Sequence, residues 1–412
     1  MIFASFRPMS VLLAAACGAA WPLARAVDLN GLVDLRASTV SSERSWSHGG
    51  FGKLGEDGGS GVVLGQAILA LQGDVSHSLA ATVVFNADSQ RRHRLDLQEA
   101  TLAWTPVPTA AWKWTARVGA FFPEINQEID YDRHEWTPTR TISASAINSW
   151  IGEELRIKGA ELGLRHLGRL GGSPHDVGLT VALFGGNDPA GTLLAWRGWG
   201  VGDRISGLSE TIVLPDLPVY RAGGAIDRQT RATHFFREID GRAGFYGKLD
   251  YSWASTLAVS AMHYDNRGDP LIVKAGQYSW RTRFDHLGVR LALPAQWELL
   301  AQWMSGNTVM GPHAVDVDYR AAYVLLAHRL GAGRLALRYD RFRTSADDIL
   351  PSDPNDEHGN ALALAYSHPL GARLSLVGEL LSVHSWRGAR RQLSLAAGQR
   401  SSSATVALRY QF

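Results

Sequence analysis

The sequence of 412 residues has almost no cysteine, no long apolar run and no marked excess of charge. With Cys17 as its only cysteine, the chain cannot form an internal disulfide. After residue 26 no segment approaches the roughly 18 uninterrupted apolar residues of a membrane-spanning helix, so helical spans are excluded. The 41 Lys and Arg nearly balance the 39 Asp and Glu, which gives no reason to expect nucleic acid as a partner.

Motifs for catalysis and for metal binding are absent as well. The sequence has no G-x-S-x-G segment, and its 14 histidines show no H-E-x-x-H spacing. Two acidic segments, residues 128–132 and 353–357, carry oxygen ligands but lack the glycine and terminal glutamate of an EF-hand loop. We interpret both as solvated loop charge and predict no catalytic residue, no metal and no cofactor.

The first 26 residues have the pattern of a cleaved secretory signal peptide. Arg7 supplies a positive start, residues 11–20 are a short apolar core, and residues 24–26 (Ala-Arg-Ala) form a small-x-small cleavage site. Lipidation at Cys17 is the alternative, but Ala14 stands where such sites usually carry leucine. The prediction is an exported chain whose single mature domain spans residues 27–412.

The mature sequence consists largely of short segments in which apolar and polar residues alternate, as β-strands with two different faces do. In WKWTARVGAFF, residues 112–122, aromatic residues alternate with Lys113, Thr115 and Arg117. Sixteen such segments can be counted, at residues 27–37, 62–72, 79–86, 95–104, 112–122, 153–166, 177–184, 242–253, 256–264, 278–293, 297–303, 319–330, 334–342, 361–368, 373–384 and 404–412. Aromatic-rich alternation of this kind is typical of a transmembrane β-barrel, whereas a soluble β-sandwich is the alternative.

The connections between these segments alternate in length. Short turns fall near residues 73–78, 105–111, 167–175, 254, 294–295, 331–333 and 369–372, and longer loops fall between them. Short turns at one end and long loops at the other are typical of an outer-membrane barrel. The fold class predicted is therefore all-β, a transmembrane antiparallel barrel of about 16 strands, wide enough for an aqueous lumen.

Residues 123–152 form the longest irregular connection in the first half of the chain, between the fifth and sixth predicted strands. Some thirty residues without alternation would be unusual in a compact soluble domain. In a wide barrel such a loop can fold back inside the wall, and we predict that it does so and narrows the lumen. The last segment, ATVALRYQF, places Leu408, Tyr410 and the terminal Phe412 on one face.

With these features the mature chain resembles the sixteen-stranded porins of Gram-negative bacteria, whose third external loop, between strands five and six, forms the constriction. The segment VGAFFPEINQE is also similar to the Gly-x-Phe-x-x-Pro segment of the phosphate-selective porin O/P group, although Glu124 stands where a second proline is common. The resemblance implies an outer-membrane location, a homotrimer, and recognition of Phe412 by the barrel-assembly machinery. Lipid and lipopolysaccharide are the expected surroundings.

Charged residues on the polar faces of the strands are the candidate functional residues, because charges along a narrow aqueous path set its selectivity. The predicted pore-lining basic residues are Lys113, Arg117, Arg156, Lys158, Arg290, Arg338 and Arg409. The constriction loop would place Glu124, Glu128, Asp130, Asp132 and Glu135 opposite them. The predicted membrane girdle comprises Trp104, Trp112, Trp114, Trp253, Trp297, Tyr323, Tyr366 and Phe412.

The function predicted from these patterns is passive diffusion of small hydrophilic solutes or ions across the outer membrane, with a mild anion preference, and no enzymatic activity. An outer-membrane enzyme of the lipase or protease type is one alternative, which a Ser and His pocket at one rim would favour. A structural or adhesive barrel with a plugged lumen is another, which bulky apolar residues pointing inward would favour. We expect the inward faces to be mostly polar.

Overall fold

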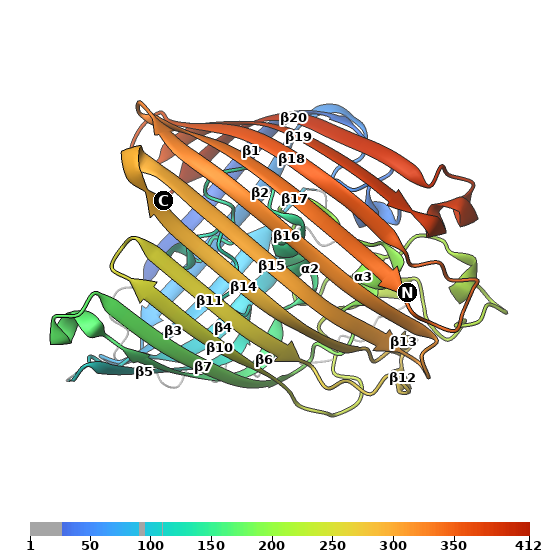
Figure 1. Ribbon diagram of the computed structural model, residues 1–412, viewed down its shortest axis with the longest axis horizontal. Coiled ribbons are helices and arrows are strands. Elements are labelled where there is room, and N and C mark those ends of the chain that lie inside the picture. Colours follow the sequence, from blue (N-terminus) through green and yellow to red (C-terminus); the bar gives the residue numbers. More distant parts are fainter. Residues whose placement is uncertain (1–26, 90–94, 109) are drawn as a thin grey trace, which may run out of the picture.

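The computed structural model describes residues 27–89, 95–108 and 110–412, so the predicted signal peptide lies outside the described residues. Sixteen strands form one closed antiparallel barrel in which consecutive barrel strands pair and β20 closes onto β1, as predicted (Figure 1). The strands of the barrel are β1 (Asp28–Ser41), β2 (Gly59–Asp74), β3 (Leu79–Ala87), β4 (Leu95–Trp104), β5 (Trp112–Phe121), β6 (Ile157–His166), β7 (His175–Gly185), β10 (Gly244–Trp253), β11 (Leu257–Asp265), β14 (Arg281–Leu293), β15 (Trp297–Met310), β16 (Val315–Leu330), β17 (Gly333–Ala346), β18 (Glu357–Pro369), β19 (Leu374–Arg387) and β20 (Gly398–Gln411).

The short turns lie at one end of the barrel, the turn end, and the long connections lie at the other, the loop end. We number the loop-end connections L1 to L8 in chain order, so that L3 is residues 122–156 and L4 is residues 186–243. The loops and turns contain α2 (Ala146–Glu154), α3 (Thr192–Trp196), two small sheets, β8 (Ile212–Val213) with β9 (Ala232–Thr233) and β12 (Val273–Lys274) with β13 (Gln277–Tyr278), and the 3-10 turns η1 (Trp46–His48), η2 (Tyr131–Arg133), η3 (Gly168–Gly171), η4 (Pro218–Tyr220), η5 (Pro294–Gln296) and η6 (Gly388–Leu393). None of the helices in the described ranges is long and apolar enough to cross a membrane.

The outer face of the barrel carries the apolar half of each alternating strand. On β17, for example, Leu335, Leu337 and Tyr339 are exposed outward while Arg338 and Asp340 are fully buried inside. Exposed apolar side chains that face away from the lumen suit a surface in contact with lipid. Trp104, Trp112, Trp114, Trp253, Trp297 and Tyr366 are exposed on this outer face toward the turn end, and Phe412 stacks on Tyr410 beside them.

The lumen is occupied by L3 and L4, and α2 and α3 are seen within the outline of the barrel (Figure 1). Trp150 of α2 is fully buried and packs against Phe284 of β14 and Tyr319 of β16, with ring centroids 5.7 and 5.4 Å away. The inward faces of β14 to β18 are therefore rich in apolar residues, and the expectation of mostly polar inward faces was wrong there. A buried helix needs an apolar wall to pack against.

Tyr323 does not belong to the outer girdle. Its side chain is 2% exposed, points into the lumen and donates a hydrogen bond to Gln302 Oε1 at 2.7 Å. Apolar residues occupy both faces of β16, so alternation alone could not show which face was inside. The lumen-facing set includes Tyr319, Tyr323 and Leu325 because α2 packs against this strand.

The sixth strand begins later than predicted. Residues 153 and 154 complete α2, and β6 starts at Ile157. Its pairing with β5 and β7 shows no register shift. Register shifts occur between Asp34 and Leu35 and between Val84 and Phe85. Because β6 itself keeps one register, Lys158 lies on its outward face.

Candidate functional site

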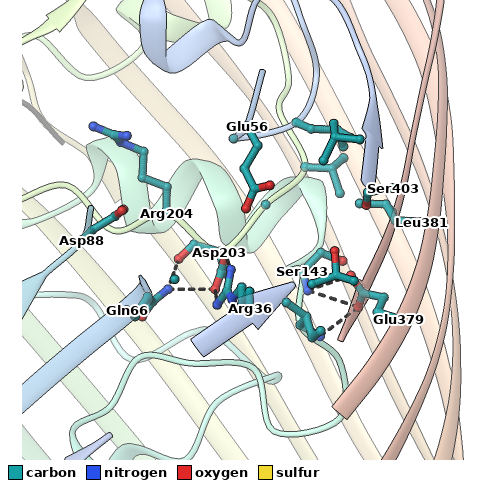
Figure 2. Close-up of a pocket in the computed structure, with 18 residues that line it drawn as sticks. Arg36, Glu56, Gln66, Asp88, Ser143, Asp203, Arg204, Glu379, Leu381 and Ser403 are labelled. Carbon is teal, nitrogen blue, oxygen red and sulfur yellow. Dashed lines mark hydrogen bonds and ion pairs between the residues drawn. The ribbon is translucent and has the colours of Figure 1, made fainter. Parts of the chain in front are cut away.

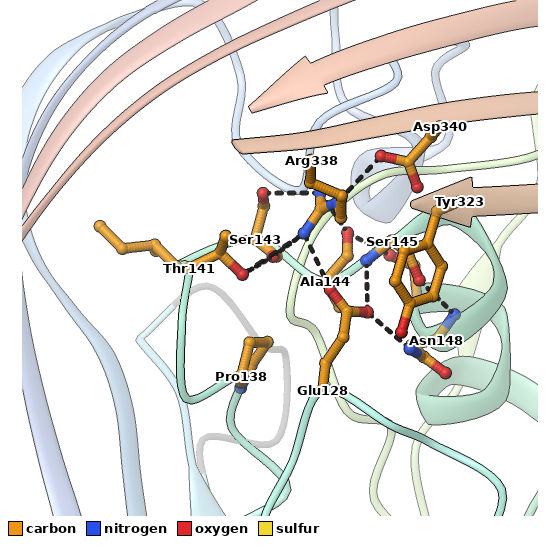
Figure 3. A network of polar contacts seen from close by, with 12 residues as sticks. Glu128, Pro138, Thr141, Ser143, Ala144, Ser145, Asn148, Tyr323, Arg338 and Asp340 are labelled. Carbon is orange, nitrogen blue, oxygen red and sulfur yellow. Dashed lines mark hydrogen bonds and ion pairs between the residues drawn. The ribbon is translucent and has the colours of Figure 1, made fainter. Parts of the chain in front are cut away.

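L3 is fixed inside the barrel by a buried network around Arg338 of β17 (Figure 3). Arg338 is fully buried, with Nη1 3.0 Å from Glu128 Oε1 of L3 and Nε 2.9 Å from Asp340 Oδ2 on its own strand. Its Nη2 donates to the Ala144 carbonyl at 3.0 Å. The ion pairs and the carbonyl contact hold L3 against the wall of the barrel.

The same two carboxylates stabilise the start of α2. Glu128 Oε2 accepts a hydrogen bond from the Ser145 N–H at 2.8 Å, and Asp340 Oδ1 accepts one from the Ala146 N–H at 3.0 Å. The Ser145 side chain also caps the helix by accepting from Asn148 N at 3.3 Å. Carboxylates at this end also complement the helix dipole.

Further contacts attach L3 to the walls all around the lumen. Arg140 forms a bidentate ion pair with Glu298 of β15, at 2.7 and 3.0 Å. Four strands further round the barrel, Glu379 of β19 accepts from the Ile142 and Ser143 N–H groups. L3 therefore crosses the lumen, as predicted from its place in the strand order.

The surface of L3 that faces the turn end meets the predicted basic residues of the wall. Arg117 of β5 donates to Glu124 of L3 at 2.8 Å and to Glu161 of β6 at 3.1 Å. Arg290 of β14 donates to the Gln127 carbonyl at 3.0 Å. Together with partly exposed Lys113, these groups line the part of the lumen between L3 and the turn end, which we call the vestibule.

The remaining acidic residues of L3 have different surroundings. Glu135 accepts from Arg133 and, at 2.8 Å, from Gln411 of β20. Asp130 caps the short η2 turn by accepting a hydrogen bond from Asp132 N at 3.1 Å. Asp130 and Asp132 are both exposed. Another predicted basic wall residue, Arg409 of β20, is 6% exposed and pairs with Asp34, while it donates to the Pro138 carbonyl of L3 at 2.9 Å.

Arg156 and Lys158 do not line the aqueous path. Arg156 is fully buried between the rings of Phe122 and Phe236, 4.4 and 4.6 Å from their centroids, where no water-filled path reaches it. Lys158 lies on the outward face at the loop end, and its Nζ donates to the Phe236 carbonyl at 2.8 Å. Arg156 is buried because it lies in L3, before β6 begins, and Lys158 faces outward because β6 keeps one register from Ile157 onward.

L4 covers L3 from the loop end, a feature that alternation and loop length did not predict. Its Asp203 forms ion pairs with Arg36 of β1, and Gln66 of β2 donates to Asp203 at 2.8 Å. The Trp199 N–H donates to Glu357 of β18, three strands from β1 around the barrel, at 3.0 Å. L4 itself leaves the wall at β7 and rejoins it at β10, on the other side of the barrel from these contacts. L4 therefore also spans the lumen from wall to wall.

A glycine allows the close approach of L4 to β18. Gly198 has φ of 82°, and a Cβ there would overlap the Glu357 carboxylate. Glu357 also pairs with the buried Lys53 of L1, whose Nζ donates to the Trp199 carbonyl at 2.8 Å. Burial lowers the pKa of Lys53 to about 8, against the attraction of Glu357. Three loop-end segments are thus joined at one buried point.

Glu154, at the end of α2, joins L3 to L4. Its carboxylate accepts from Trp150 Nε1 at 2.5 Å, from Leu193 N at 3.0 Å and from Gly191 N at 3.2 Å. Burial raises the pKa of Glu154 to about 7, and burial also raises the pKa of Asp188 in L4 to about 7. Both loop carboxylates are held where ionisation is costly.

These raised pKa values predict that L4 packs more tightly on L3 at acid pH. A folded-state pKa raised from 4.5 to about 7 means that the stabilisation is present below pH 4.5 and is lost as pH rises through 7. A shift of this size corresponds to about 3 kcal/mol. We expect limited proteolysis of L4 to be slower at pH 5.5 than at pH 8.

In Glu154→Gln/Asp188→Asn this pH dependence should be largely lost. L4 should be looser at every pH, because each amide offers one acceptor oxygen rather than two. Asp130→Asn, on the exposed side of L3, is the control and should retain the response. An unchanged pH dependence in the double variant would contradict the assignment to these two groups.

Between L3, L4 and the β1–β2 and β19–β20 walls lies a cavity of about 80 Å³ (Figure 2). Water occupies about 30 Å³ per molecule in the liquid, so the cavity has room for only a few waters. Charged residues of both signs line it: Arg36, Arg204, Glu56, Asp88, Asp203 and Glu379. None of them was among the predicted pore-lining residues, although Arg36 and Glu379 lie in the alternating segments 27–37 and 373–384. Alternation in these two segments was the available signal.

Three carboxylates outside the predicted site residues meet in L4. Asp188, Glu238 and Asp240 have ligand atoms within 4.8 Å of one another. Their oxygens already accept backbone N–H groups: Asp188 from Ile239 and Asp240, and Glu238 from Gly186 and Gly241. These hydrogen bonds from backbone amides explain the closeness of the carboxylates as a result of how L4 folds. The predicted solvated segment 353–357 is instead partly internal, since buried Asp353 accepts from Trp196 at 3.1 Å.

In comparisons with known proteins, no family model matches the sequence and no curated relative does. Solved structures do match in fold. The outer membrane channel DcaP of Acinetobacter baumannii has a TM-score of 0.57 at 10% identity, covering 94% of this chain and 97% of that one. An anion-selective porin from Comamonas acidovorans has a TM-score of 0.52 at 12% identity (94% and 99% covered), and Salmonella typhi OmpF one of 0.51 at 10% identity (95% and 100% covered).

The protein is therefore a sixteen-stranded barrel with the fold of the outer-membrane porins. The closed barrel, the apolar outer band and the placement of short turns at one end and long loops at the other together fit the Gram-negative outer membrane. At about 10% sequence identity, the similarity to these structures establishes the fold. The function has to be argued from the residues of the lumen.

Proposed function

We propose that the protein is an outer-membrane porin through which small hydrophilic solutes or ions diffuse passively. The observation that carries the proposal is the inward course of L3, whose acidic residues pair with basic residues of the wall, as in Arg117 with Glu124. A polar vestibule lies on the turn-end side of this loop, and the charged cavity of Figure 2 lies on its loop-end side. The aqueous path would join the two along the β1–β2 and β19–β20 walls.

Selectivity should be weak and set by two regions of opposite tendency. The vestibule presents Lys113, Arg117 and Arg290, which favour anions. The narrow cavity presents four carboxylates and two guanidinium groups, which favour cations. Charges within about a Debye length of a permeating ion, roughly 8 Å at physiological salt, act on it directly. The mild anion preference expected from the sequence therefore depends on the vestibule.

Reversal potentials in a planar bilayer under a salt gradient test both parts of this proposal. We expect steady single-channel conductance, and a shift of the reversal potential toward cation selectivity in Arg117→Gln/Arg290→Gln. The control is Arg165→Gln, an exposed arginine at the turn-end mouth beside Asp176, which should shift it less. A folded, heat-modifiable barrel that never conducts would contradict the porin assignment.

The two alternative functions, a barrel enzyme and a plugged barrel, require different structural features. A barrel enzyme needs a nucleophile beside an activating base, and the histidine–carboxylate pairs of the described residues, such as His48 with Asp57, have no serine hydroxyl bonded to the histidine. A plugged barrel is favoured by the apolar packing of α2. The conductance measurement distinguishes it from a porin.

We also propose the properties that the resemblance implies. Residues 1–26 would be removed as a signal peptide, Phe412 would be read by the barrel-assembly machinery, and the barrel would form a homotrimer among lipid and lipopolysaccharide. One outer membrane protein of similar fold, OmpT of Vibrio cholerae, is described as a trimer form. Mass spectrometry of the mature chain and native electrophoresis test these points.

A further inference from the structure

The outer wall of the barrel changes from apolar to basic near the loop end of β16 to β20. Four arginines and two histidines that face outward define a basic patch: Arg320, Arg341, Arg343, His358, His384 and Arg400. All six are exposed, and on each strand they continue the outward apolar series of the membrane band. The basic patch thus belongs to the side of the wall that faces away from the lumen.

The strand register arranges these residues in two adjacent rows. Arg320 lies opposite Arg343, which lies opposite His358. In the row below, Arg341 lies opposite Asn360, then His384 and Arg400 follow. On β16 to β18 the next row toward the turn end is apolar, with Val324, Tyr339 and Leu362 in register, and on β19 and β20 it continues as Ser382 and Ser402. One row is two residues, or about 7 Å along a strand, so the change to apolar surface is abrupt.

The arginines of the basic patch have no carboxylate partner among the described residues. Arg320, Arg341, Arg343 and Arg400 form no ion pair there, whereas most other arginines of the lumen and loops do. Like charges directly opposite on neighbouring strands, as at Arg320 and Arg343, destabilise a sheet unless an anion lies between them.

The carboxylates nearest to the basic patch are already engaged. Asp285 is bonded to His263 at 2.8 Å, Asp318 accepts from Asn307 at 3.0 Å, and Asp356 accepts from the Ala346 N–H at 3.1 Å. None of these three carboxylates forms an ion pair with an arginine of the basic patch among the described residues, so the patch is open to an external anion.

The geometry points to a phosphate-bearing outer-leaflet lipid as that anion, and we propose that the basic patch binds the phosphates of lipopolysaccharide. Guanidinium groups on facing strands, about 5 Å apart in the sheet, can hold one phosphate between them. The acyl chains of the same molecule would lie on Leu337, Leu362 and Leu364 directly below. Trp386, stacked on His358 at 5.4 Å, adds an aromatic ring at headgroup height.

A soluble phosphate would gain nothing from the apolar rows, which is why a lipid is the better occupant. The inference rests on the outer-membrane location and on the proposed lipopolysaccharide surroundings, and not on conduction. A barrel that fails to conduct would therefore leave it standing.

The test uses the full-length mature protein, refolded in detergent and titrated with diphosphoryl lipid A while its thermal unfolding is followed. We expect lipid A to raise the unfolding midpoint of the unchanged protein. In Arg320→Gln/Arg343→Gln its apparent affinity should fall at least about tenfold, because two charge-assisted contacts are lost. Without lipid, this variant should unfold at the same or a higher temperature, since a like-charge pair has been removed.

Arg329→Gln/Arg373→Gln is the matched control, with two arginines changed at the turn end, and it should bind lipid A as the unchanged protein does. If Arg320→Gln/Arg343→Gln does not fold, Arg341→Gln/Arg400→Gln takes its place. Equal lipid A affinity in patch and control variants would overturn the proposal. So would inorganic phosphate that protects the protein as well as lipid A does at matched ionic strength, because the site would then be one for a free anion.

Discussion

Removing the part of L4 that lies in the lumen should raise the single-channel conductance by about threefold or more, because conductance follows the narrowest cross-section of an aqueous path. The change is the replacement of residues 190–236 by a short Gly/Ser linker. The Asp188 N–H donates to the Arg237 carbonyl at 3.3 Å, so the two ends of this segment already lie together. Planar-bilayer recording of the refolded variant makes the measurement.

The deletion removes the contacts that close the loop-end side of the lumen. Asp203 no longer reaches Arg36 and Gln66, and Trp199 no longer covers Trp150 of α2, whose ring centroid lies 6.1 Å away. Exposure of α2 should also lower the unfolding temperature, since each buried tryptophan contributes a large apolar area. The barrel itself should persist because its strand pairs do not depend on L4.

A smaller deletion in the same loop is the control. Residues 222–225 lie at the exposed tip of L4, away from the lumen contacts, and their removal should leave conductance unchanged. If the deletion of 190–236 also leaves conductance unchanged in a folded barrel, L4 does not limit the path and L3 alone forms the constriction.

The sequence was sufficient to predict the strands because each outer face must be apolar and each turn must be short. Alternation gave all sixteen strands, and the strand order gave the inward course of L3. It failed where both faces of a strand are apolar. On β16 the choice between Tyr323 and its neighbour Val324 depends on what fills the lumen, and no local pattern carries that information.

The role of L4 could not be predicted from the sequence for a related reason. Its contacts join residues far apart in the chain, such as Asp203 with Arg36 and Trp199 with Glu357. A long irregular loop has the same kind of sequence pattern whether it lies outside the barrel or inside it. Arg338 and Arg409 were selected as pore-lining because they lie on polar faces, yet loop packing buries both. Polarity predicted the direction of each side chain but not its contact with water.

Arg338→Gln should release L3 from the wall and cost the protein about 3–5 kcal/mol of stability, the usual effect of breaking a buried ion pair by removing one partner. Glu128 and Asp340 would remain buried without their cation, at distances of 3.0 and 2.9 Å from where it was. Urea unfolding of the refolded barrel, followed by tryptophan fluorescence, measures the loss. Single-channel current should become noisier as L3 moves.

Removing the two carboxylates together with Arg338 should not restore stability, although apolar replacement of a buried ion network often does. The reason is that Glu128 and Asp340 also accept the Ser145 and Ala146 N–H groups at the start of α2. An Arg338→Met/Glu128→Leu/Asp340→Leu variant would leave both donors buried and unpaired, at a further cost of about 1–3 kcal/mol each. Arg329→Gln at the turn end of the neighbouring strand is the control. A triple variant as stable as the unchanged protein would show that α2 is held by its apolar packing alone.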